Sequence, residues 1–341
     1  MDEIIADLAQ MQIQSFFEVN DRISQQECNE EAARITGGTV QPTAVQGASS
    51  YTVNATAGKT STVVQFRLPD SPLPMVMLQI VEQSYKGFTP HHRDMGMFKG
   101  LPVFTMTDIG GVSMYLARPQ LHKNNCHLLH ETLKDYARFF ASAWHNPADQ
   151  LIETRTSLRE KYSSQLRELQ AGLPSRFRPT LDVLLSQLDG LFTEDWPLVP
   201  NHVDLLENNI HVDQNTGKLT GVCDWRDTEI GPFGLSLGGL ETMLGIARSP
   251  TLWEYHANEP ELRELFWQTF YASIGNITPQ WRDRIQLARN VGLFLQHGFA
   301  WNDHGVRVPA PDGEEELPYL EAVMLRLGDR AVSPVRNSLV Q

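Results

Sequence analysis

Residues 201–225 read NHVDLLENNIHVDQNTGKLTGVCDW, and this stretch decides the fold. Two short apolar runs flank a turn sequence rich in Asp, Asn and Gly at 213–217, which predicts a β-hairpin. If the hairpin closes around that turn, Asp224 lies opposite the middle of the segment between Asp204 and Asn209. At about 3.3 Å per strand residue, a curled loop can aim these three polar side chains at one point.

This set of side chains is typical of phosphoryl transfer from a nucleotide. One carboxylate orients and deprotonates a hydroxyl, while an amide and a second carboxylate hold Mg²⁺ on the phosphates. The simpler alternative is a hairpin that contains Asp and Asn only because turns favour them. That alternative is sufficient for Asp213 and Asn215, but it does not account for Asp204, Asn209 and Asp224 at this spacing.

The segment resembles the catalytic loop of the aminoglycoside phosphotransferase family, and most of all its large fungal branch. That family shares the protein-kinase fold, so the resemblance implies a two-lobed α+β protein with a small β-rich N-terminal lobe and a mainly helical C-terminal lobe. It also implies that His202 fixes the loop, that Asp204 is the catalytic base, and that Asn209 and Asp224 bind Mg²⁺. The implied reaction is ATP-dependent phosphorylation of a hydroxyl on a small molecule.

Composition limits the other classes of function. The chain has 341 residues, of which 41% are hydrophobic and 20% charged, as in ordinary globular proteins large enough for two lobes. A net charge of −13 argues against a nucleic-acid partner. Three cysteines without paired spacing predict a reducing, cytoplasmic location. The N-terminus lacks a secretory pattern, and no stretch of about 18 apolar residues predicts a membrane span.

The first part of the chain changes from helical to extended patterns. We expect helices at 2–18 and 25–35, followed by antiparallel strands at 40–45, 51–55 and 62–67. The turn between the first two strands contains Gly47, Ser49 and Ser50. In a kinase-like N-terminal lobe this turn lies over the nucleotide phosphates, where backbone N–H groups and hydroxyls bind them. An ordinary hairpin turn would have the same sequence.

Arg67 ends the third strand, and the resemblance aligns it with the family's Lys that holds the α- and β-phosphates. This is a departure, because the planar guanidinium has a different reach from an ammonium group. A helix is expected over 74–86, in which Gln79 or Glu82 takes the place of the family's carboxylate partner. The other interpretation of Arg67 is a solvated strand end.

A strand is expected at 101–106, followed by a Gly-rich connector. In the family this connector is the hinge, so the resemblance implies that the backbone around Thr107 and Ile109 binds the adenine edge. The expected organisation is an N-terminal lobe at 1–106, a hinge at 107–111 and a C-terminal lobe at 112–341.

The C-terminal part has mainly helical periodicity. Apolar side chains recur on one face of 127–145, and Asn146-Pro147 predicts the end of that helix. Further helices are expected at 150–171, after Thr180 as an N-terminal cap, and at 260–273, 279–297 and 317–328. The family's acceptor pocket lies among these helices, but their sequences contain no readable substrate chemistry.

Three other motifs are weaker. The G-x-S-x-G match at 234–238 follows loop-forming residues rather than the buried strand that a hydrolase nucleophile requires. The sequence Gly-Lys-Thr at 58–60 resembles the end of a P-loop, but Val53 stands where its first glycine is needed. His91 and His92 have no second ligand pair at metal-binding spacing, which favours loop histidines.

Two alternatives to simple kinase activity remain open. Arg67 and Gln79 depart from the family pattern, which fits a kinase-fold protein that binds ligands without net kinase activity. Alternatively, the same site activates a substrate for elimination, cyclisation or condensation in a biosynthetic pathway, releasing ADP and phosphate without a stable phosphoester.

Overall fold

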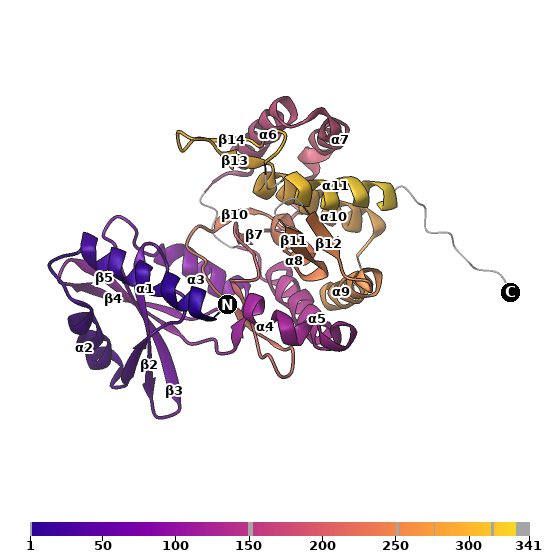
Figure 1. Cartoon of the computed structure of the whole chain (residues 1–341). Coiled ribbons are helices and arrows are strands. Elements are labelled where there is room, and N and C mark those ends of the chain that lie inside the picture. Colours follow the sequence, from indigo (N-terminus) through magenta and orange to yellow (C-terminus); the bar gives the residue numbers. More distant parts are fainter. Residues whose placement is uncertain (1, 149–152, 250–251, 276, 315–316, 332–341) are drawn as a thin grey trace. The chain divides into compact units, whose positions relative to one another are not determined.

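The computed structural model describes residues 2–148, 153–249, 252–275, 277–314 and 317–331 (Figure 1). The chain forms two compact units. The first contains the residues up to Gly110 together with Thr220–Arg226, and the second contains Gly111–Leu219 together with the residues from Asp227 onward. The first unit is built around one β-sheet and the second is mainly helical, which confirms the predicted α+β class.

The sheet of the first unit has five antiparallel strands in the order β1-β2-β3-β5-β4. Their bounds are β1 Thr39–Pro42, β2 Ser50–Ala57, β3 Thr60–Arg67, β4 His92–Phe98 and β5 Leu101–Thr107. The first three strands and β5 confirm the sequence predictions, whereas β4 is an addition. Its sequence, HRDMGMF, is mostly exposed and interrupted by a register shift between Asp94 and Met97. An edge strand of this kind lacks the apolar alternation that sequence patterns detect, so the predicted loop around His92 is wrong.

Helices pack against this sheet, and side chains of both form a hydrophobic core. α1 (Asp2–Val19) and α2 (Gln25–Thr36) confirm the two predicted helices, and α3 (Met75–Ser84) confirms the third. α2 begins with a capping box, in which Ser24 and Glu27 bond to each other's backbone N–H groups. Phe16 of α1 and Cys28 of α2 are buried against β2 and β3. The apolar face of the sheet is therefore fixed by both N-terminal helices.

The second unit is a set of packed helices (Figure 1). They are α4 Met114–Leu121, α5 Lys123–His145, α6 Arg155–Gly172, α7 Arg178–Gln187, α8 Leu240–Leu244, α9 Glu259–Ile274, α10 Pro279–His297 and α11 Leu317–Ala331. Three 3₁₀ turns join them, at Ser175–Phe177, Leu188–Leu191 and Leu235–Gly239. α5 packs along α9 through a buried aromatic cluster that includes Tyr136, Phe140 and Phe266.

Most of these helices confirm the prediction, with three exceptions, one of which is α8, which was not predicted. The predicted cap Thr180 is wrong, because α7 already begins at Arg178 and has a proline in its first turn, where the fixed φ of proline suits a helix. α4 was not predicted, because it is short and contains Pro119, which sequence rules treat as a helix breaker. The expected start of α6 at 150–152 lies outside the described residues.

Short strands complete the second unit. They are β6 Val112–Ser113, β7 Leu198–Asn201, β8 Ile210–Val212, β10 Glu229–Pro232, β11 Gly245–Ser249, β12 Leu252–Tyr255, β13 Phe299–Trp301 and β14 Arg307–Pro309. Four antiparallel pairs form, β6 with β8, β7 with β10, β11 with β12 and β13 with β14. β9 (Leu219–Val222) begins in this unit and continues into the first.

The segment Thr220–Arg226 belongs to the first unit, although the sequence placed all residues from 112 to 341 in the C-terminal lobe. The physical reason lies in its contacts. The N–H of Val222 donates to the carbonyl of Phe88 at 2.7 Å. The ring of Trp225 packs on Tyr85, with their centroids 4.8 Å apart. Thr220–Arg226 is thus continuous in sequence with the second unit, but its contacts are with residues of the first unit.

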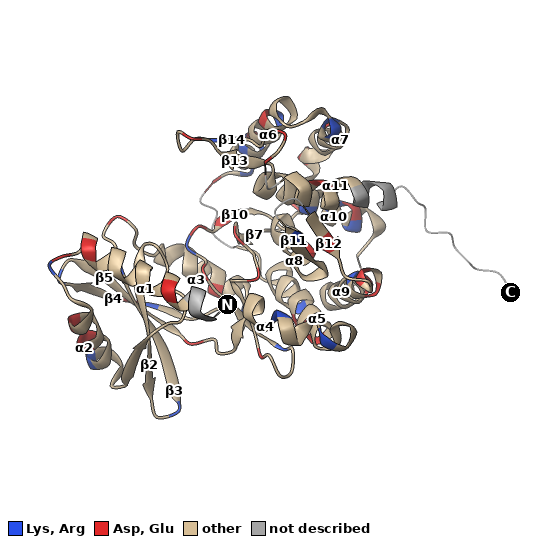
Figure 2. Ribbon diagram, in the orientation of Figure 1, with Lys and Arg blue, Asp and Glu red and all other residues tan. Residues whose placement is uncertain are grey.

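Charged side chains are spread over the helices and loops of both units (Figure 2). Asp and Glu outnumber Lys and Arg, 41 against 28. Every helix in the described ranges is too short or too polar to cross a bilayer.

Candidate functional site

The loop that carries His202 and Asp204 follows β7 directly and is anchored by buried groups. Asn201, the last residue of β7, is 5% exposed, and its Oδ1 accepts from both the N–H and the hydroxyl of Ser236, at 3.3 and 3.2 Å. The same hydroxyl lies 3.3 Å from the carbonyl of His202. The buried ring of His202 accepts the N–H of Asp204 at its Nδ1, at 3.1 Å. The start of the loop is therefore fixed from two sides.

Asp204 and Asn209 lie in contact across the loop. The side-chain amide of Asn209 donates to the backbone oxygen of Asp204 at 2.8 Å and to its Oδ2 at 3.2 Å. Between them, the N–H of Leu206 bonds to the carbonyl of Asp204 at 2.9 Å. The carboxylate is exposed and oriented, as a general base must be. Since the Asn209 nitrogen is the donor, its Oδ1 is the atom able to ligand a cation.

Asp224 lies in the first unit, in an unusual backbone conformation. Its φ is 60°, in the left-handed region that non-glycine residues rarely adopt. The indole N–H of Trp225 donates to the carbonyl of Val222 at 2.9 Å, and Arg226 donates to the hydroxyl of Ser71 at 2.8 Å. These neighbours hold the turn, and the side chain of Asp224 is exposed. Residues in such conformations cluster at functional sites.

Gly47 and Ser49 lie in the turn between β1 and β2, and Ser50 is the first residue of β2. Gly47 forms a β-bridge with Ser50, and the carbonyl of Ser49 accepts the N–H of Leu68 at 3.0 Å. Gly47 is exposed, whereas Ser50 is 4% exposed, with its hydroxyl 3.4 Å from that of Thr52. Of these residues, Gly47 and Ser49 lie nearer to solvent.

Arg67 and Glu82 have well-defined partners in the first unit. The guanidinium of Arg67 is buried and donates to the backbone oxygen of Ser71 at 2.6 Å. The carboxylate of Glu82 accepts from the N–H of His92 at 2.8 Å and lies 2.6 Å from Nδ1 of His91. Burial opposes ionisation of Glu82, but these bonds prevail and lower its pKa. The pairing of Glu82 with Arg67 stays a prediction.

Thr107 and Ile109 lie at the end of β5. The N–H of Thr107 donates to the carbonyl of His91 at 3.0 Å, and its hydroxyl accepts the N–H of His91 at 2.9 Å. Ile109 packs closely on Gly221, because a Cβ added to Gly221 would lie 3.1 Å from the Cβ of Ile109. Thr107 and Ile109 belong to the first unit, which extends to Gly110.

The predicted site residues thus divide between the two units. His202, Asp204 and Asn209 share one loop of the second unit. The rest belong to the first, and they are Gly47, Ser49, Ser50, Arg67, Glu82, Thr107, Ile109 and Asp224. The second metal candidate, Asp224, is accordingly on the same unit as the nucleotide candidates.

The weaker motifs have structural roles. Ser236 of the G-x-S-x-G match is buried and bonded to the His202 loop. Lys59 lies in the turn between β2 and β3, beside Gly58 with a φ of 64°. Across the described ranges, no group of three or more His, Cys, Asp or Glu is placed to hold a metal ion.

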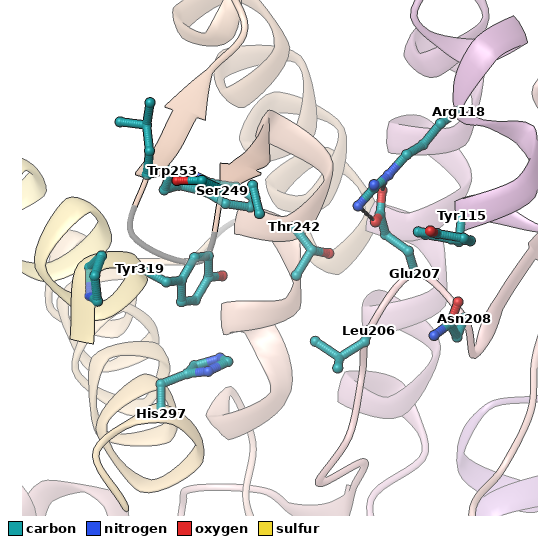
Figure 3. A pocket seen from close by; sticks show the side chains of 13 residues that line it. Tyr115, Arg118, Leu206, Glu207, Asn208, Thr242, Ser249, Trp253, His297 and Tyr319 are labelled. Atoms are coloured by element: carbon teal, nitrogen blue, oxygen red, sulfur yellow. Dashed lines mark hydrogen bonds and ion pairs between the residues drawn. The ribbon is translucent and has the colours of Figure 1, made fainter. Parts of the chain in front are cut away.

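The second unit also contains a cavity of about 580 Å³ (Figure 3). One wall consists of Leu206, Glu207 and Asn208, which belong to the loop between Asp204 and Asn209. The other walls come from α4, from the β11–β12 hairpin with α8, and from the ends of α10 and α11. They contribute Tyr115, Arg118, Thr242, Ala247, Ser249, Leu252, Trp253, His297, Pro318 and Tyr319. A pocket of this size accommodates a drug-sized molecule.

An ion pair lies at the edge of this cavity. Arg118 donates from Nε to Glu207 at 2.8 Å and from a second nitrogen to the other carboxylate oxygen (Figure 3). Its guanidinium also stacks 4.9 Å from the ring centroid of Tyr115. Burial raises the pKa of Glu207, although Arg118 opposes this shift.

The sequence did not indicate these cavity residues. Arg118 and Glu207 are 89 positions apart. Arg118 lies in α4, the helix that was not predicted because it contains Pro119. Trp253, His297 and Tyr319 come from three separate elements. Their only sequence signal was ordinary apolar periodicity, which a packed core produces equally well.

Comparisons with known proteins bear on the family and the fold of this chain. The model of the phosphotransferase enzyme family matches residues 76–264, more than half of the chain. The structure is similar to that of a candidate aminoglycoside phosphotransferase from Ralstonia eutropha JMP134. The two share 13% identity and a TM-score of 0.53, over 80% of this chain and 88% of that one. This likeness confirms the predicted protein-kinase-like fold.

Two further solved structures are less similar. A macrolide 2′-phosphotransferase from Brachybacterium faecium has 14% identity and a TM-score of 0.46, with 79% of this chain and 91% of that chain covered. A choline kinase from Streptococcus pneumoniae has 11% identity and a TM-score of 0.45, with 82% and 94% covered. No curated protein sequence matches this one significantly.

Proposed function

The chain belongs to the phosphotransferase enzyme family, and on that premise we propose that it transfers the γ-phosphoryl group of ATP to a hydroxyl of a small molecule. The acceptor oxygen forms a bond to the γ-phosphorus while the bond between that phosphorus and the bridging oxygen of ADP breaks. The proton of the hydroxyl passes to the carboxylate of Asp204. The products are a phosphoester and ADP.

The observation that carries this proposal is the loop from His202 to Asn209. His202 Nδ1 accepts the N–H of Asp204, and Asn209 donates to Oδ2 of the same residue. These bonds orient one exposed carboxylate, which supports its role in positioning and deprotonating a hydroxyl. Positioning accounts for most of the catalysis in phosphoryl transfer.

The residues proposed for Mg²⁺ are Asn209, through Oδ1, and Asp224, through its carboxylate. Mg²⁺ binds hard oxygen ligands and in nucleotide sites needs only one or two protein groups besides phosphates and water. A donor set of one amide and one carboxylate fits that requirement. When bound, the ion would neutralise charge on the β- and γ-phosphates.

The remaining candidates are proposed to bind the nucleotide. The turn with Gly47, Ser49 and Ser50 would lie over the phosphates together with Arg67. The backbone of Thr107 and Ile109 would pair with adenine. In this proposal the N-terminal lobe is 1–106, the hinge is 107–111 and the C-terminal lobe contributes the base.

The first test is thermal unfolding with ATP, with and without Mg²⁺, of the wild type and of Asp224→Gly. Glycine removes both carboxylate oxygens and tolerates the left-handed φ of 60°, so the fold is preserved. We expect Mg²⁺ with ATP to raise the Tm by several degrees, and we expect the variant to lose this rise. Asp21→Gly, the same change at an exposed turn residue of the first unit, is the control and should keep it.

One observation favours a second candidate function. Arg67 is 6% exposed and donates to the backbone of Ser71 at 2.6 Å, which supports a kinase fold that binds ligands without turnover. A wild type that shows no Mg²⁺-dependent rise in Tm would favour this candidate. If ADP and free phosphate form without a phosphoester by mass spectrometry, the site activates a substrate for elimination, cyclisation or condensation instead.

A further inference from the structure

We infer that the cavity beside the Asp204 loop is the acceptor pocket, and that it selects an uncharged, ring-bearing alcohol or phenol rather than a polycationic amine. This inference rests on the proposed function, because it names the substrate class of that same site. It follows from the place of the cavity, the charge of its lining and two polar groups in its aromatic wall.

The cavity lies against the loop that carries the proposed base, at residues that follow Asp204. Leu206, Glu207 and Asn208 line it and directly follow the Asp204 segment. Consecutive Cα atoms are about 3.8 Å apart, so the wall begins within roughly 8 Å of the Cα of Asp204. The bond of the Leu206 N–H to the carbonyl of Asp204, at 2.9 Å, makes this stretch compact. A molecule bound in the cavity can therefore bring a hydroxyl to the loop.

The lining carries no net charge. Among the described residues that line the cavity, the only carboxylate is that of Glu207, which both donor sides of Arg118 neutralise. Burial lowers the pKa of His297 to about 4, so that its imidazole is neutral at pH 7. A ligand with several ammonium groups would lose hydration here without gaining carboxylate partners, and such burial is costly.

The far wall is aromatic. The ring of Tyr319 lies edge-on to Trp253, with centroids 4.8 Å apart, and 4.7 Å from the ring of His297. Its hydroxyl projects toward Thr242 across the cavity (Figure 3). Leu252 and Pro318 add apolar surface. Flat apolar rings pack well against aromatic groups in such arrangements.

Two polar atoms of this wall lack protein partners. The indole Nε1 of Trp253 and the hydroxyl of Tyr319 are both buried, and no described residue hydrogen-bonds to either. Burial raises the pKa of Tyr319 well above its usual range, so the hydroxyl stays protonated. Buried donors without acceptors are unfavourable. A hydroxyl, carbonyl or ether oxygen of a ligand that reached either atom would supply the missing partner.

The test compares ligands that differ only in charge. The neutral probes are 2-naphthalenemethanol, 2-naphthol and 4-hydroxybiphenyl, and the cationic ones are 2-naphthalenemethanamine and kanamycin. Binding to the full chain is measured by calorimetry at pH 7 without nucleotide. We expect at least one neutral probe to bind, and 2-naphthalenemethanol to bind at least tenfold more tightly than the matched amine.

Variants locate the binding. Tyr319→Phe and Trp253→Phe each remove one polar group and keep a ring, so each should weaken the bound neutral probe about five- to tenfold. Trp301→Phe is the control, because Trp301 is 72% exposed and lies outside the cavity lining. It should leave the affinity unchanged.

Three results would overturn the inference. They are binding of none of the neutral probes, tighter binding of the amine or kanamycin, and equal affinity in both cavity variants and the wild type. These outcomes are separate from failure of the proposed function, which is tested by the Mg²⁺-dependent effect of ATP. An enzyme that binds ATP and phosphorylates kanamycin would keep the proposed function and refute the substrate class. If neutral probes bind but ATP with Mg²⁺ leaves the Tm unchanged, the cavity keeps its inferred selectivity and the proposed function is refuted.

Discussion

The side-chain amide of Asn209 holds Asp204 at two places, at 2.8 Å from its backbone oxygen and 3.2 Å from Oδ2. The two residues are five positions apart, so the loop closes on itself and orients the carboxylate from within. His202 supports the same residue from the other side through the N–H of Asp204. The proposed metal ligand, Asn209, therefore also orients the proposed base, Asp204, through its side-chain amide.

Replacement of Asp204 by Asn should abolish turnover and spare nucleotide binding. The variant keeps the shape of the side chain but cannot accept a proton, so we expect the rate to fall by about 10²- to 10⁴-fold. The measurement is ADP release in the presence of the neutral alcohols named above, beside the rise in Tm with Mg²⁺ and ATP. Asp213→Asn, in the turn of the same hairpin, should behave as the wild type. Full turnover in Asp204→Asn would remove this residue from catalysis.

Glu241→Gln should strongly destabilise the protein. Glu241 is fully buried and accepts from Arg263 at 2.5 and 2.7 Å, from Tyr255 at 2.9 Å, and from Arg289. Without the carboxylate charge, Arg289 loses its carboxylate partner in the interior and Arg263 keeps only Glu259, at a cost of about 3 kcal/mol. Urea unfolding at pH 7 measures the change. A loss below about 1 kcal/mol would show that this network is not an important source of stability.

The control and the pH dependence follow from the same network. Glu254→Gln removes an exposed partner of Arg248 and should change the free energy of unfolding by less than about 1 kcal/mol. Burial alone would raise the pKa of Glu241, but Arg289 and Arg263 lower it to about 2, from an ordinary value of 4.5. Its contribution is therefore present above pH 4.5 and lost as the pH falls toward 2. The difference between wild type and Glu241→Gln should narrow over that range.

His122 should make the protein less stable in mild acid. Its ring lies 4.5 Å from that of His256, and Nε2 of both rings is buried without a partner among the described residues. Burial, with smaller effects of His256, Arg118 and Arg248, lowers the pKa of His122 from 6.5 to about 4. Below pH 6.5 the unfolded chain binds a proton that the folded protein does not. The free energy of unfolding should therefore fall as the pH drops from 6.5 to 4.

His122→Phe provides the corresponding measurement. It keeps the ring and removes the titrating group, so the decrease in the urea midpoint between pH 7 and pH 5 should be smaller than in the wild type. His304→Phe alters an exposed histidine and should leave the decrease as it is. An unchanged pH profile in His122→Phe would show that other groups cause the acid sensitivity.

Gly292→Ala should destabilise the protein, although helix propensity predicts the opposite. Gly292 lies inside α10, where alanine is favoured by about 1 kcal/mol. A Cβ at this position would lie 1.9 Å from the carbonyl oxygen of Leu235, which belongs to the backbone and cannot turn aside. We expect a net loss of about 2 kcal/mol in urea unfolding. Gly190→Ala has nothing within 4 Å of the added methyl and should not lose stability; equal effects of both would contradict the close packing.

Local chemistry made much of the fold predictable. The three strands before Arg67 and the long helices of the second unit follow from alternation and helical periodicity, which depend on neighbouring residues. β4 was not predicted because an exposed edge strand need not alternate apolar and polar residues. α4 was not predicted because it is short and contains Pro119, which local rules treat as a helix breaker. Both failures occur where tertiary contacts override local preference.

The sequence by itself determined that His202, Asp204 and Asn209 lie near one another, because residues a few positions apart in one short loop cannot be far apart in space. Tertiary structure alone decided which distant groups became neighbours. Glu207 meets Arg118 across 89 positions, Trp253 meets Tyr319 from separate elements, and Thr220–Arg226 joins the unit that does not flank it in sequence. These contacts arise from burial and shape, which act on the folded chain and leave no spacing in the sequence. The loop is therefore the basis of the proposed reaction, and the cavity is the basis of the inferred acceptor class.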